Sequence, residues 1–424
     1  MKYLLDKLFL RSNNLDNVSH DLKDLTYKTP ANKIFKAINS YSDSSEIRYV
    51  GGCVRKIINK EKIDDIDLAT NLDPKDVCEA LKKSEINFYE TGIEHGTITA
   101  LIDDYKFEIT SLREDISTDG RHAEVKFSKD WKKDAARRDF TINAIYSDRE
   151  GNLFDPYHGK EDLEKGEVNF IGNPEKRIKE DYLRILRYLR FFLNYSKQKH
   201  KSENIKHIKM NLDGISKLSK ERLLDELKKI LSPKILENIN NDKFCLEILE
   251  AIFPQLKYFK IFAKLNSYSS QVLKELDFIF IISLLVIDQT DNLDYFLYKF
   301  NISKKDQIRL KNIHEFYNEK ITSKTFSKEN LNRIFYFKGK EILIDILSFR
   351  IFKLKKLDNN LIELIKFYKD MIKPIMPIKA DNLMAKYKIP EGKVLGDKLR
   401  IIEKEWVNNN FKISDQQVEN IINN

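Results

Sequence analysis

The fold is decided by residues 48–70, which read R-Y-V-G-G-C-V-R-K-I-I-N-K-E-K-I-D-D-I-D-L-A-T. This pattern predicts a short apolar strand, a Gly51-Gly52 turn, the start of a helix, and a second strand that carries Asp65 and Asp67. Successive side chains of a strand point to opposite faces, so residues two apart share a face. We therefore expect the two carboxylates to enter one cavity beside the glycine turn.

The chemistry of these groups indicates metal-assisted phosphoryl or nucleotidyl transfer. Carboxylate oxygens suit Mg²⁺ that is bound together with substrate phosphates. A glycine turn at a helix start, here followed by Arg55, suits the phosphates themselves. The alternative is an exposed D-x-D turn next to glycines that serve only the backbone. A P-loop is excluded, because the chain lacks G-x-x-x-x-G-K-[ST].

The composition is that of a soluble, Lys-rich globular protein. Its 424 residues, 42% hydrophobic and 33% charged, are enough for about two to four domains. A net charge of +9 favours a polyanionic partner. The three cysteines form no C-x-x-C, which excludes a disulfide framework and a Cys-type zinc site and fits a reducing cytoplasm.

We expect no membrane association. The N-terminal segment is a poor signal peptide, because Asp6 interrupts its apolar run and no small-residue cleavage site follows. The longest apolar run, residues 278–287, is about half a membrane span and is expected to be a buried core helix.

The pattern along the chain changes after about residue 160. Residues 1–45 resemble a polar, mostly helical leader. The next hundred residues mix short strands with helices, and the rest of the chain is dominated by 3.6-residue periodicity. Pro374 and Pro377 indicate a last boundary before the C-terminal segment.

A third carboxylate, Glu108, lies in the alternating segment F-E-I-T at 107–110. It is expected to face the same cavity as the two aspartates, and the alternative is a solvent-facing position on an edge strand. The following loop, D-I-S-T-D-G-R-H at 115–122, offers Asp119 and Arg121 as nucleotide contacts after closure. Such loops are otherwise solvent-facing connectors.

A second cationic block is A-A-R-R-D-F-T-I-N-A at 135–144. Arg137 and Arg138 are candidates for holding a triphosphate, because the planar guanidinium matches phosphate oxygens. Asp139 and Asn143 are expected to reach the sugar. An ordinary surface ion-pair cluster is the alternative.

The segment E-D-Y-L-R-I-L-R-Y-L-R-F at 180–191 predicts a helix with Asp181, Arg184 and Arg187 along one face. A row of intrahelical salt bridges would give the same pattern. Cytosine and adenine, however, both present an amino donor beside a ring-nitrogen acceptor. A carboxylate next to a guanidinium matches that edge, whereas uracil or guanine would leave groups unmatched at about 1–3 kcal/mol each. Asp181 with Arg184 would thus select C and A without a template.

Together these blocks resemble the class II tRNA nucleotidyltransferase / bacterial poly(A) polymerase family, over about residues 46–232. The matching motifs are G-G-C-V-R-K at 51–56, D-I-D at 65–67, R-R-D-F-T-I-N-A at 137–144, E-D-Y-L-R at 180–184, and the E-R-L-L-D-E-L-K-K-I-L run from Glu221. One position departs from the family, because Lys56 replaces its acidic residue after the motif arginine. We expect Lys56 to lie away from the metal pair and to alter only local pairing.

The resemblance implies an α+β protein, with a nucleotidyltransferase (polymerase-beta-like) β-sheet head followed by an all-helical neck, body and tail. The expected parts are a helical leader (1–45), the head (46–150), the neck with its nucleobase-selecting helix (151–232), the body (233–375) and the tail (376–424). It also implies addition of C, C and A to tRNA 3′ ends from CTP and ATP.

The resemblance further assigns roles to the residues. Asp65 and Asp67, with Glu108, would be catalytic, and the two aspartates would hold two Mg²⁺ ions. The triphosphate would be held by Gly51, Gly52, Arg55, Arg137 and Arg138. The base would be read by Glu180, Asp181, Arg184 and Arg187. The Lys-rich helical part would bind the tRNA acceptor arm.

Three alternatives stay open. A bacterial poly(A) polymerase shares these motifs, but members of that branch often end in a strongly basic extension, unlike the end of this chain. Enzymes that add only CC or only A are a narrower option, and the loop with Asp119 and Arg121 argues against CC-only addition. A non-catalytic RNA-binding protein is the third. The protein is expected in the cytoplasm, as a monomer or a homodimer.

Overall fold

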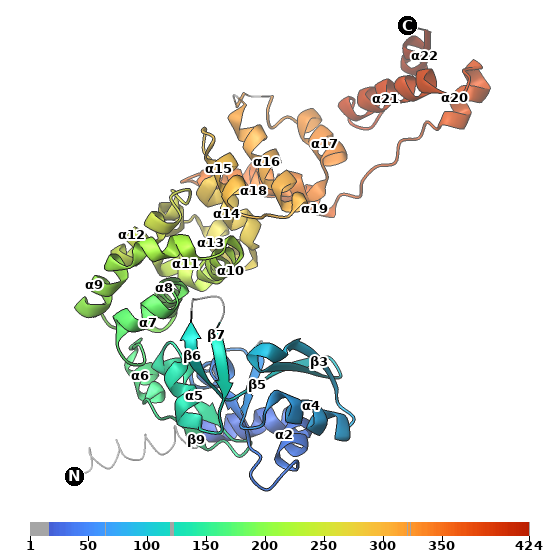
Figure 1. The fold of residues 1–424 in the computed structure, drawn as a ribbon. Coiled ribbons are helices and arrows are strands. Elements are labelled where there is room, and N and C mark those ends of the chain that lie inside the picture. Colours follow the sequence, from blue (N-terminus) through green and yellow to red (C-terminus); the bar gives the residue numbers. More distant parts are fainter. Residues whose placement is uncertain (1–16, 64, 119–122, 320, 323, 424) are drawn as a thin grey trace. The chain divides into compact units, whose positions relative to one another are not determined.

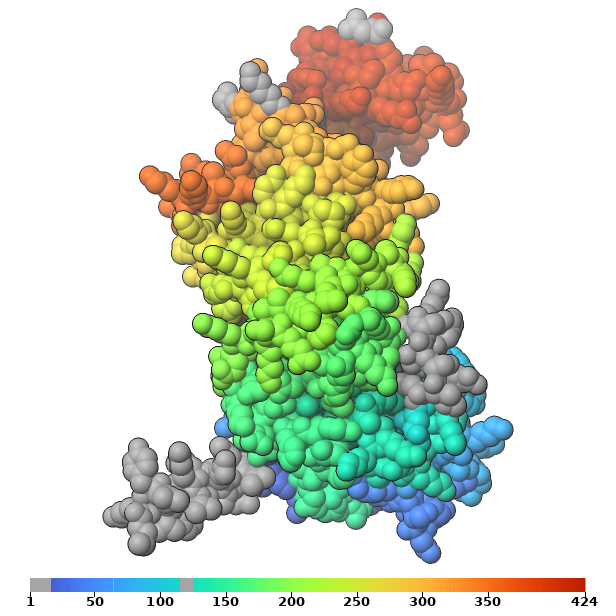
Figure 2. Space-filling model, turned by 60° about the vertical axis from the view of Figure 1, so that its left-hand side comes forward, coloured from blue at the N-terminus to red at the C-terminus, as the bar shows by residue number. Residues whose placement is uncertain are grey.

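The computed structural model describes residues 17–63, 65–118, 123–319, 321–322 and 324–423. The chain divides into two compact units, residues 1–230 and 231–424. Each unit is formed by one continuous stretch of chain, as the sequence colouring of Figures 1 and 2 shows.

Unit 1 is built on a seven-stranded mixed sheet with the strand order β3-β4-β5-β2-β1-β8-β9. Its strands are β1 (Ile47–Val50), β2 (Ile66–Thr70), β3 (Asn87–Gly92), β4 (Thr97–Ile102), β5 (Tyr105–Ser111), β8 (Tyr146–Ser147) and β9 (Leu153–Phe154). The pair β2–β5 is parallel and the other pairs are antiparallel. The alternating segment at 107–110 thus lies on strand β5.

A separate two-stranded ladder and several short helices also belong to this part of unit 1. They are β6 (Arg113–Thr118), β7 (Ala123–Phe127), α2 (Ala31–Asn39), α3 (Gly52–Ile58), α4 (Pro74–Lys83) and α5 (Trp131–Arg137). Two of these helices have, at their N-terminus, a residue that favours the start of a helix. Pro74 occupies the first turn of α4, and Asp130 caps α5 by accepting from the Lys132 and Lys133 N–H groups.

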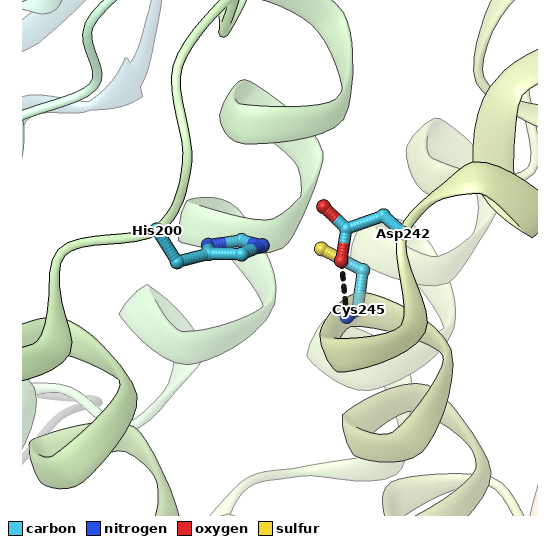
Figure 3. A group of neighbouring side chains, drawn as sticks. All are labelled: His200, Asp242 and Cys245. Carbon is cyan, nitrogen blue, oxygen red and sulfur yellow. Dashed lines mark hydrogen bonds between the residues drawn. The ribbon is translucent and has the colours of Figure 1, made fainter.

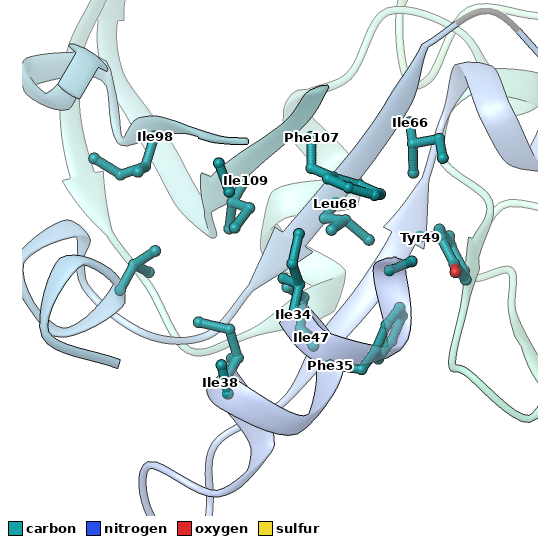
Figure 4. Close-up of a cluster of buried hydrophobic side chains, with 14 of the residues drawn as sticks. Ile34, Phe35, Ile38, Ile47, Tyr49, Ile66, Leu68, Ile98, Phe107 and Ile109 are labelled. Atoms are coloured by element: carbon teal, nitrogen blue, oxygen red, sulfur yellow. The ribbon is translucent and has the colours of Figure 1, made fainter. Parts of the chain in front are cut away.

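One face of the sheet is covered by α2, α3 and α4 (Figure 4). Ile34, Phe35 and Ile38 of α2 are completely buried against strand residues that include Leu68 and Phe107. The expectation of a separate leader ending at residue 45 is therefore wrong for this helix. Its apolar residues recur at helical spacing and have a sheet face to cover, so α2 is part of the same core.

The other face of the sheet carries a smaller core around Trp131 and Tyr146. Strand β2 serves both faces: Ile66 and Leu68 enter the larger core, and Ala69 enters the smaller one. Because side chains alternate, Asp67 lies on the same face as Ala69. The large core thus fixes which way the carboxylate points.

The remainder of unit 1 is helical, with α6 (Gly159–Lys165), α7 (Pro174–Glu180), α8 (Leu183–Tyr195), α9 (Ser202–Met210) and α10 (Lys220–Ile230). Helix α8 packs on α10 and α7. Its buried residues include Ile185, Leu186 and Leu189.

Unit 2 is helical throughout its described residues. Its α-helices are α11 (Pro233–Asn238), α12 (Lys243–Ile252), α13 (Ser267–Val272), α14 (Phe278–Val286), α15 (Asn292–Lys299), α16 (Lys304–Asn318), α17 (Lys328–Phe337), α18 (Lys340–Lys353), α19 (Asn359–Asp370), α20 (Ala380–Tyr387), α21 (Lys393–Asn408) and α22 (Asp415–Asn423). Several begin at an acidic cap; at α12, Asp242 Oδ1 accepts from the Cys245 N–H at 2.8 Å (Figure 3).

Helix α14 is a buried core helix, as its apolar run predicted, with Phe280 to Val286 all buried. Among the described residues, no helix combines the length and the apolar character that crossing a bilayer requires. Helices α20 to α22 share a core of their own that includes Leu383, Ile402 and Val418. The α+β fold is confirmed, whereas the boundaries of neck, body and tail stay predictions.

Replacing Phe35 by alanine tests whether α2 belongs to the sheet core. We expect Phe35→Ala to lower the free energy of unfolding of unit 1 by about 3–5 kcal/mol, because the ring is completely buried. The chain has two tryptophans, Trp131 in unit 1 and Trp406 in unit 2. In a Trp406→Phe background, tryptophan fluorescence during urea unfolding therefore reports on unit 1. The neighbouring exposed Lys36→Ala is the control, expected within about 0.5 kcal/mol. Equal effects of the two changes would contradict the placement of α2.

Candidate active site

A cavity of about 790 Å³ opens beside the glycine turn in unit 1. Gly51 has a φ of +64°, a conformation that favours glycine, and it leads directly into α3. A Cβ on Gly51 would lie 3.4 Å from Arg138 Nη1, and one on Gly52 would lie 3.6 Å from Asp67 Oδ2. Gly51 and Gly52 therefore expose their backbone to the cavity. Gly51 lies close to the cationic Arg138, and Gly52 lies close to the anionic Asp67.

Asp65 and Asp67 line this same cavity, as the alternation of β2 predicted. Glu108 is the register partner of Asp67 on β5 and thus lies on the same sheet face. Its side chain is 49% exposed, pairs with Lys106 at 3.0 Å, and is not among the residues that line the cavity. The structure brings the two aspartates together and leaves Glu108 at the border of the site.

The carboxylates fit a divalent cation. Burial raises the pKa of Asp67, and the neighbouring charges of Glu108 and Asp65 raise it further, against the opposing effect of Arg138 and Arg55. A cluster whose negative charges repel one another in this way gains from a cation that takes their oxygens as ligands. Asp65 and Asp67 are the residues that would hold it.

Arg137 and Arg138 also line the cavity, and both are held from behind by Asp134. Asp134 Oδ1 accepts from Arg137 Nε at 2.8 Å, and Oδ2 accepts from Arg138 Nη2 at 3.2 Å and from the Tyr146 hydroxyl at 2.7 Å. Burial alone would raise the pKa of Asp134, but Arg138 and Arg137 outweigh burial and hold that pKa at about 2. The carboxylate is therefore ionised at neutral pH.

Asp139 and Asn143 line the cavity beside these arginines. Asp139 Oδ1 accepts from Asn143 Nδ2 at 2.8 Å, and Asp139 Oδ2 accepts from Arg187 Nε at 2.6 Å. Burial opposes ionisation of Asp139, but Arg187 and Asn143 lower its pKa well below the usual range. Asn143 Oδ1 in turn accepts from Arg55, whose guanidinium lies over the Phe191 ring.

The base-reading segment differs from the prediction in one respect. The periodicity predicts one continuous helix, but α7 ends at Glu180 and α8 begins at Leu183, with Asp181 extended between them (φ −152°, ψ 107°). Asp181 lies outside both helices. Its carboxylate accepts from the Leu183 N–H at 3.1 Å and from Arg222 of α10 at 2.8 Å.

Arg184 is paired with Glu180 at 2.7 Å rather than with Asp181. Glu180 also accepts from Arg177, whose guanidinium donates to the carbonyl oxygens of Arg137 and Arg138. Asp181, Arg184 and Arg187 all line the cavity, whereas Glu180 does not. Asp181 and Arg184 thus face the same space, and their joint selection of the base stays a prediction.

Lys56 lines the same cavity as Asp65 and Asp67, and its effect on catalysis stays a prediction. A helix of only seven residues keeps its whole length near the turn that starts it. Asp119 and Arg121, predicted to contact the nucleotide, lie outside the described residues.

The sequence reasoning did not name several residues of the site. These are Arg113, Arg222 and Lys229 on the cavity wall, and Asp134 behind it. The spacing of Asp134 to Arg137 and Arg138, three and four residues on a helix, was a usable signal. Arg222 lay in the E-R-L-L motif but its pairing with Asp181 joins two helices, which spacing along one helix cannot reveal.

The described lining is strongly cationic. Ten arginine and lysine side chains face four aspartates: Arg55, Lys56, Arg113, Arg137, Arg138, Arg184, Arg187, Arg190, Arg222 and Lys229, against Asp65, Asp67, Asp139 and Asp181. Such a cavity attracts a polyanion. Because Asp65 and Asp67 line the same cavity, the arrangement suits a triphosphate that arrives with a divalent cation.

Comparison with known proteins points the same way. The model of the Poly A polymerase head domain family matches residues 47–169. The human protein "CCA tRNA nucleotidyltransferase 1, mitochondrial" is 46% identical over 192 residues, which are 45% of this chain and 44% of that protein. The chain thus matches less than half the length of this relative.

A longer match extends to the CCA-adding enzyme of Staphylococcus haemolyticus, 31% identical over 308 residues, which are 72% of each chain. The fold is similar to that of the Bacillus stearothermophilus CCA-adding enzyme crystallised with CTP, with a TM-score of 0.66 and 20% identity over 89% of this chain and 92% of that one. The Thermotoga maritima CCA-adding enzyme in complex with tRNA gives a TM-score of 0.56 and 18% identity over 92% and 94%. The chain belongs to the family of the CCA-adding enzymes.

Proposed function

We propose that this protein adds C, C and A to the 3′ end of tRNA, taking the nucleotides from CTP and ATP without a template and releasing pyrophosphate. The observation that carries the proposal is a single cavity that joins the Asp65–Asp67 pair, a cationic wall and the Asp181–Arg184 segment. The relatives named as CCA-adding enzymes support the same reading.

We assign Asp65 and Asp67 to the place where the RNA 3′-hydroxyl would meet the triphosphate. Two Mg²⁺ ions held by Asp65 and Asp67 would activate the RNA 3′-hydroxyl and steady the leaving pyrophosphate. Glu108, on the neighbouring strand, adds negative charge to this end of the cavity and so strengthens the hold on cations.

The triphosphate is assigned to the glycine turn and the arginines. Gly51 and Gly52 let phosphate oxygens approach the backbone closely, since no side chain stands in the way. Arg137 and Arg138 offer guanidinium groups at the cavity wall. Arg55 and Asp139 are engaged with Asn143, so we assign Asn143 and its partners to shaping the ribose position.

Base selection is assigned to Asp181 and Arg184 at the break between α7 and α8. The carboxylate accepts from an exocyclic amino group and the guanidinium donates to the adjacent ring nitrogen, which admits C and A. Glu180 forms an ion pair with Arg184, and Arg222 forms one with Asp181. These partners fix the positions of the two base-reading side chains. Arg187 supports the wall through Asp139.

The acceptor arm of tRNA is the proposed macromolecular partner, and the tRNA complex of the Thermotoga maritima enzyme supports this choice. A cytoplasmic location and a monomeric or homodimeric state stay predictions. The human relative is named as mitochondrial.

Supplying tRNAs that lack all, two or one of the terminal nucleotides tests the proposed reaction. With labelled CTP and ATP, singly and mixed, we expect two C additions followed by one A and then a stop. The measurement is gel analysis of the extended RNA. Long adenosine tails on unrelated RNA would instead identify a poly(A) polymerase, and tight tRNA binding without any addition would identify a non-catalytic binder.

Removing one metal ligand should stop the reaction without releasing the RNA. We expect Asp67→Ala to lower CTP incorporation by more than about 100-fold, because loss of a direct metal ligand should cost more than loss of a residue that only supports one. The Kd for tRNA should stay within about twofold of the wild-type value. Chelation by EDTA should have the same effect on wild type, and Mg²⁺ should reverse it. Asp104→Ala, on the exposed turn before β5, is the matched control and keeps full activity. An active Asp67→Ala variant would disprove the metal site.

Changing the base-reading carboxylate should alter selectivity. Asp181→Asn introduces an amide donor where the base amino group needs an acceptor, so we expect discrimination of CTP against UTP to fall by about 1–3 kcal/mol. The measurement is the ratio of kcat/KM for the two nucleotides with a tRNA that lacks CCA. Asp225→Asn, on the exposed surface of α10, should leave the ratio unchanged. An unchanged ratio in Asp181→Asn would remove Asp181 from base selection.

A further inference from the structure

Asp134 is a buried acid that touches both arginines of the cavity wall. Its side chain is 1% exposed, whereas those of Arg137 and Arg138 are 16% and 18% exposed. Each carboxylate oxygen takes a different arginine: Oδ1 pairs with Arg137 at 2.8 Å, and Oδ2 pairs with Arg138 at 3.2 Å. The Tyr146 hydroxyl donates to Oδ2 at 2.7 Å and also accepts from Arg138 Nε at 3.0 Å.

The same two arginines are held from their other side through the backbone. Arg177 donates to the carbonyl oxygens of both Arg137 and Arg138, and Arg184 lies 3.5 Å from the Arg137 carbonyl oxygen. Main chain and side chains are thus fixed by separate groups. The backbone contacts set where the segment lies, and the Asp134 carboxylate contacts both guanidinium groups. Arg138 is held further by the Tyr146 hydroxyl and by the Asn143 carbonyl oxygen.

We propose that Asp134 is the positioning residue of the triphosphate site, which holds Arg137 and Arg138 in the spread arrangement that receives the nucleotide. This inference rests on the proposed function only for the identity of the anion. Two neighbouring guanidinium groups repel each other, so a shared carboxylate behind them is needed to keep both at the wall before substrate arrives. Tyr146 fixes the carboxylate in turn, and its ring packs edge-on against Trp131 at 5.5 Å.

A purely structural salt bridge would predict a different outcome. Loss of a structural contact lowers stability and leaves the nucleotide affinity of the folded protein unchanged. Loss of a positioning contact raises KM for every nucleotide, because all nucleoside triphosphates share the group that the arginines bind. KM for tRNA and the choice between C and A should not change.

Asp134→Asn tests this, with Asp130→Asn as the matched control on the same helix. Asn still caps a helix, so the control keeps α5 intact. We expect Asp134→Asn to raise KM for CTP and ATP alike by about 10- to 100-fold, with kcat, KM for tRNA and the CTP/ATP ratio near those of the control. KM values within twofold of the control for both nucleotides would overturn the proposal.

Tyr146→Phe keeps the proposal testable if Asp134→Asn does not fold. It removes only the hydroxyl and should raise KM for both nucleotides by about two- to tenfold. An unchanged KM in that variant would count against the network.

Equilibrium dialysis with labelled CTP and Mg²⁺ separates this inference from the proposed function, since it needs neither tRNA nor turnover. A wild-type protein that binds CTP without extending tRNA would disprove the function alone. Equal CTP affinity of Asp134→Asn and Asp130→Asn would disprove the positioning role alone, and failure of wild type to bind CTP would overturn both.

Discussion

The site depends above all on the ion pair of Asp139 and Arg187. Asp139 belongs to the second cationic block, and Arg187 lies on α8, so the pair joins the sheet-bearing part of unit 1 to its helices. Only 7% of the Asp139 side chain is exposed, and leaving such a charge without its partner costs about 3–5 kcal/mol. Asp139 and Arg187 both line the cavity. A second connection runs beside this pair, because Arg177 donates to the carbonyl oxygens of Arg137 and Arg138.

Opposite charges lie close together in the cavity. Asp67 lies on a strand whose other face is buried in the large core, and Arg138 and Arg55 are near enough to lower its pKa. Several of the lining arginines are held by acids that do not line the cavity, such as Asp134 and Glu180. Because those acids neutralise part of the charge from behind, the arginines keep their hydrogen-bonding edges toward the cavity without facing one another unpaired.

Much of the strand-based part of the site was predictable from the sequence. The alternation around Asp67, the glycine turn, and the cationic block all depend on local rules that act over a few residues. The rest depended on contacts between elements. The break at Asp181 was invisible to periodicity, because Asp181 keeps the expected spacing while its backbone is extended. Its pairing with Arg222 and the burial of α2 follow from packing between distant segments, which no local pattern specifies.

The strand order of the sheet has a consequence for synthesis on the ribosome. Strand β1 lies between β2 and β8, and its Val50 pairs with Tyr146, which is translated long after β2. Until that residue emerges, one edge of β1 presents unpaired N–H and C=O groups to whatever strand is nearby. A nascent chain with an open edge invites pairing with another copy. Slow translation between β2 and β8 would prolong that exposure.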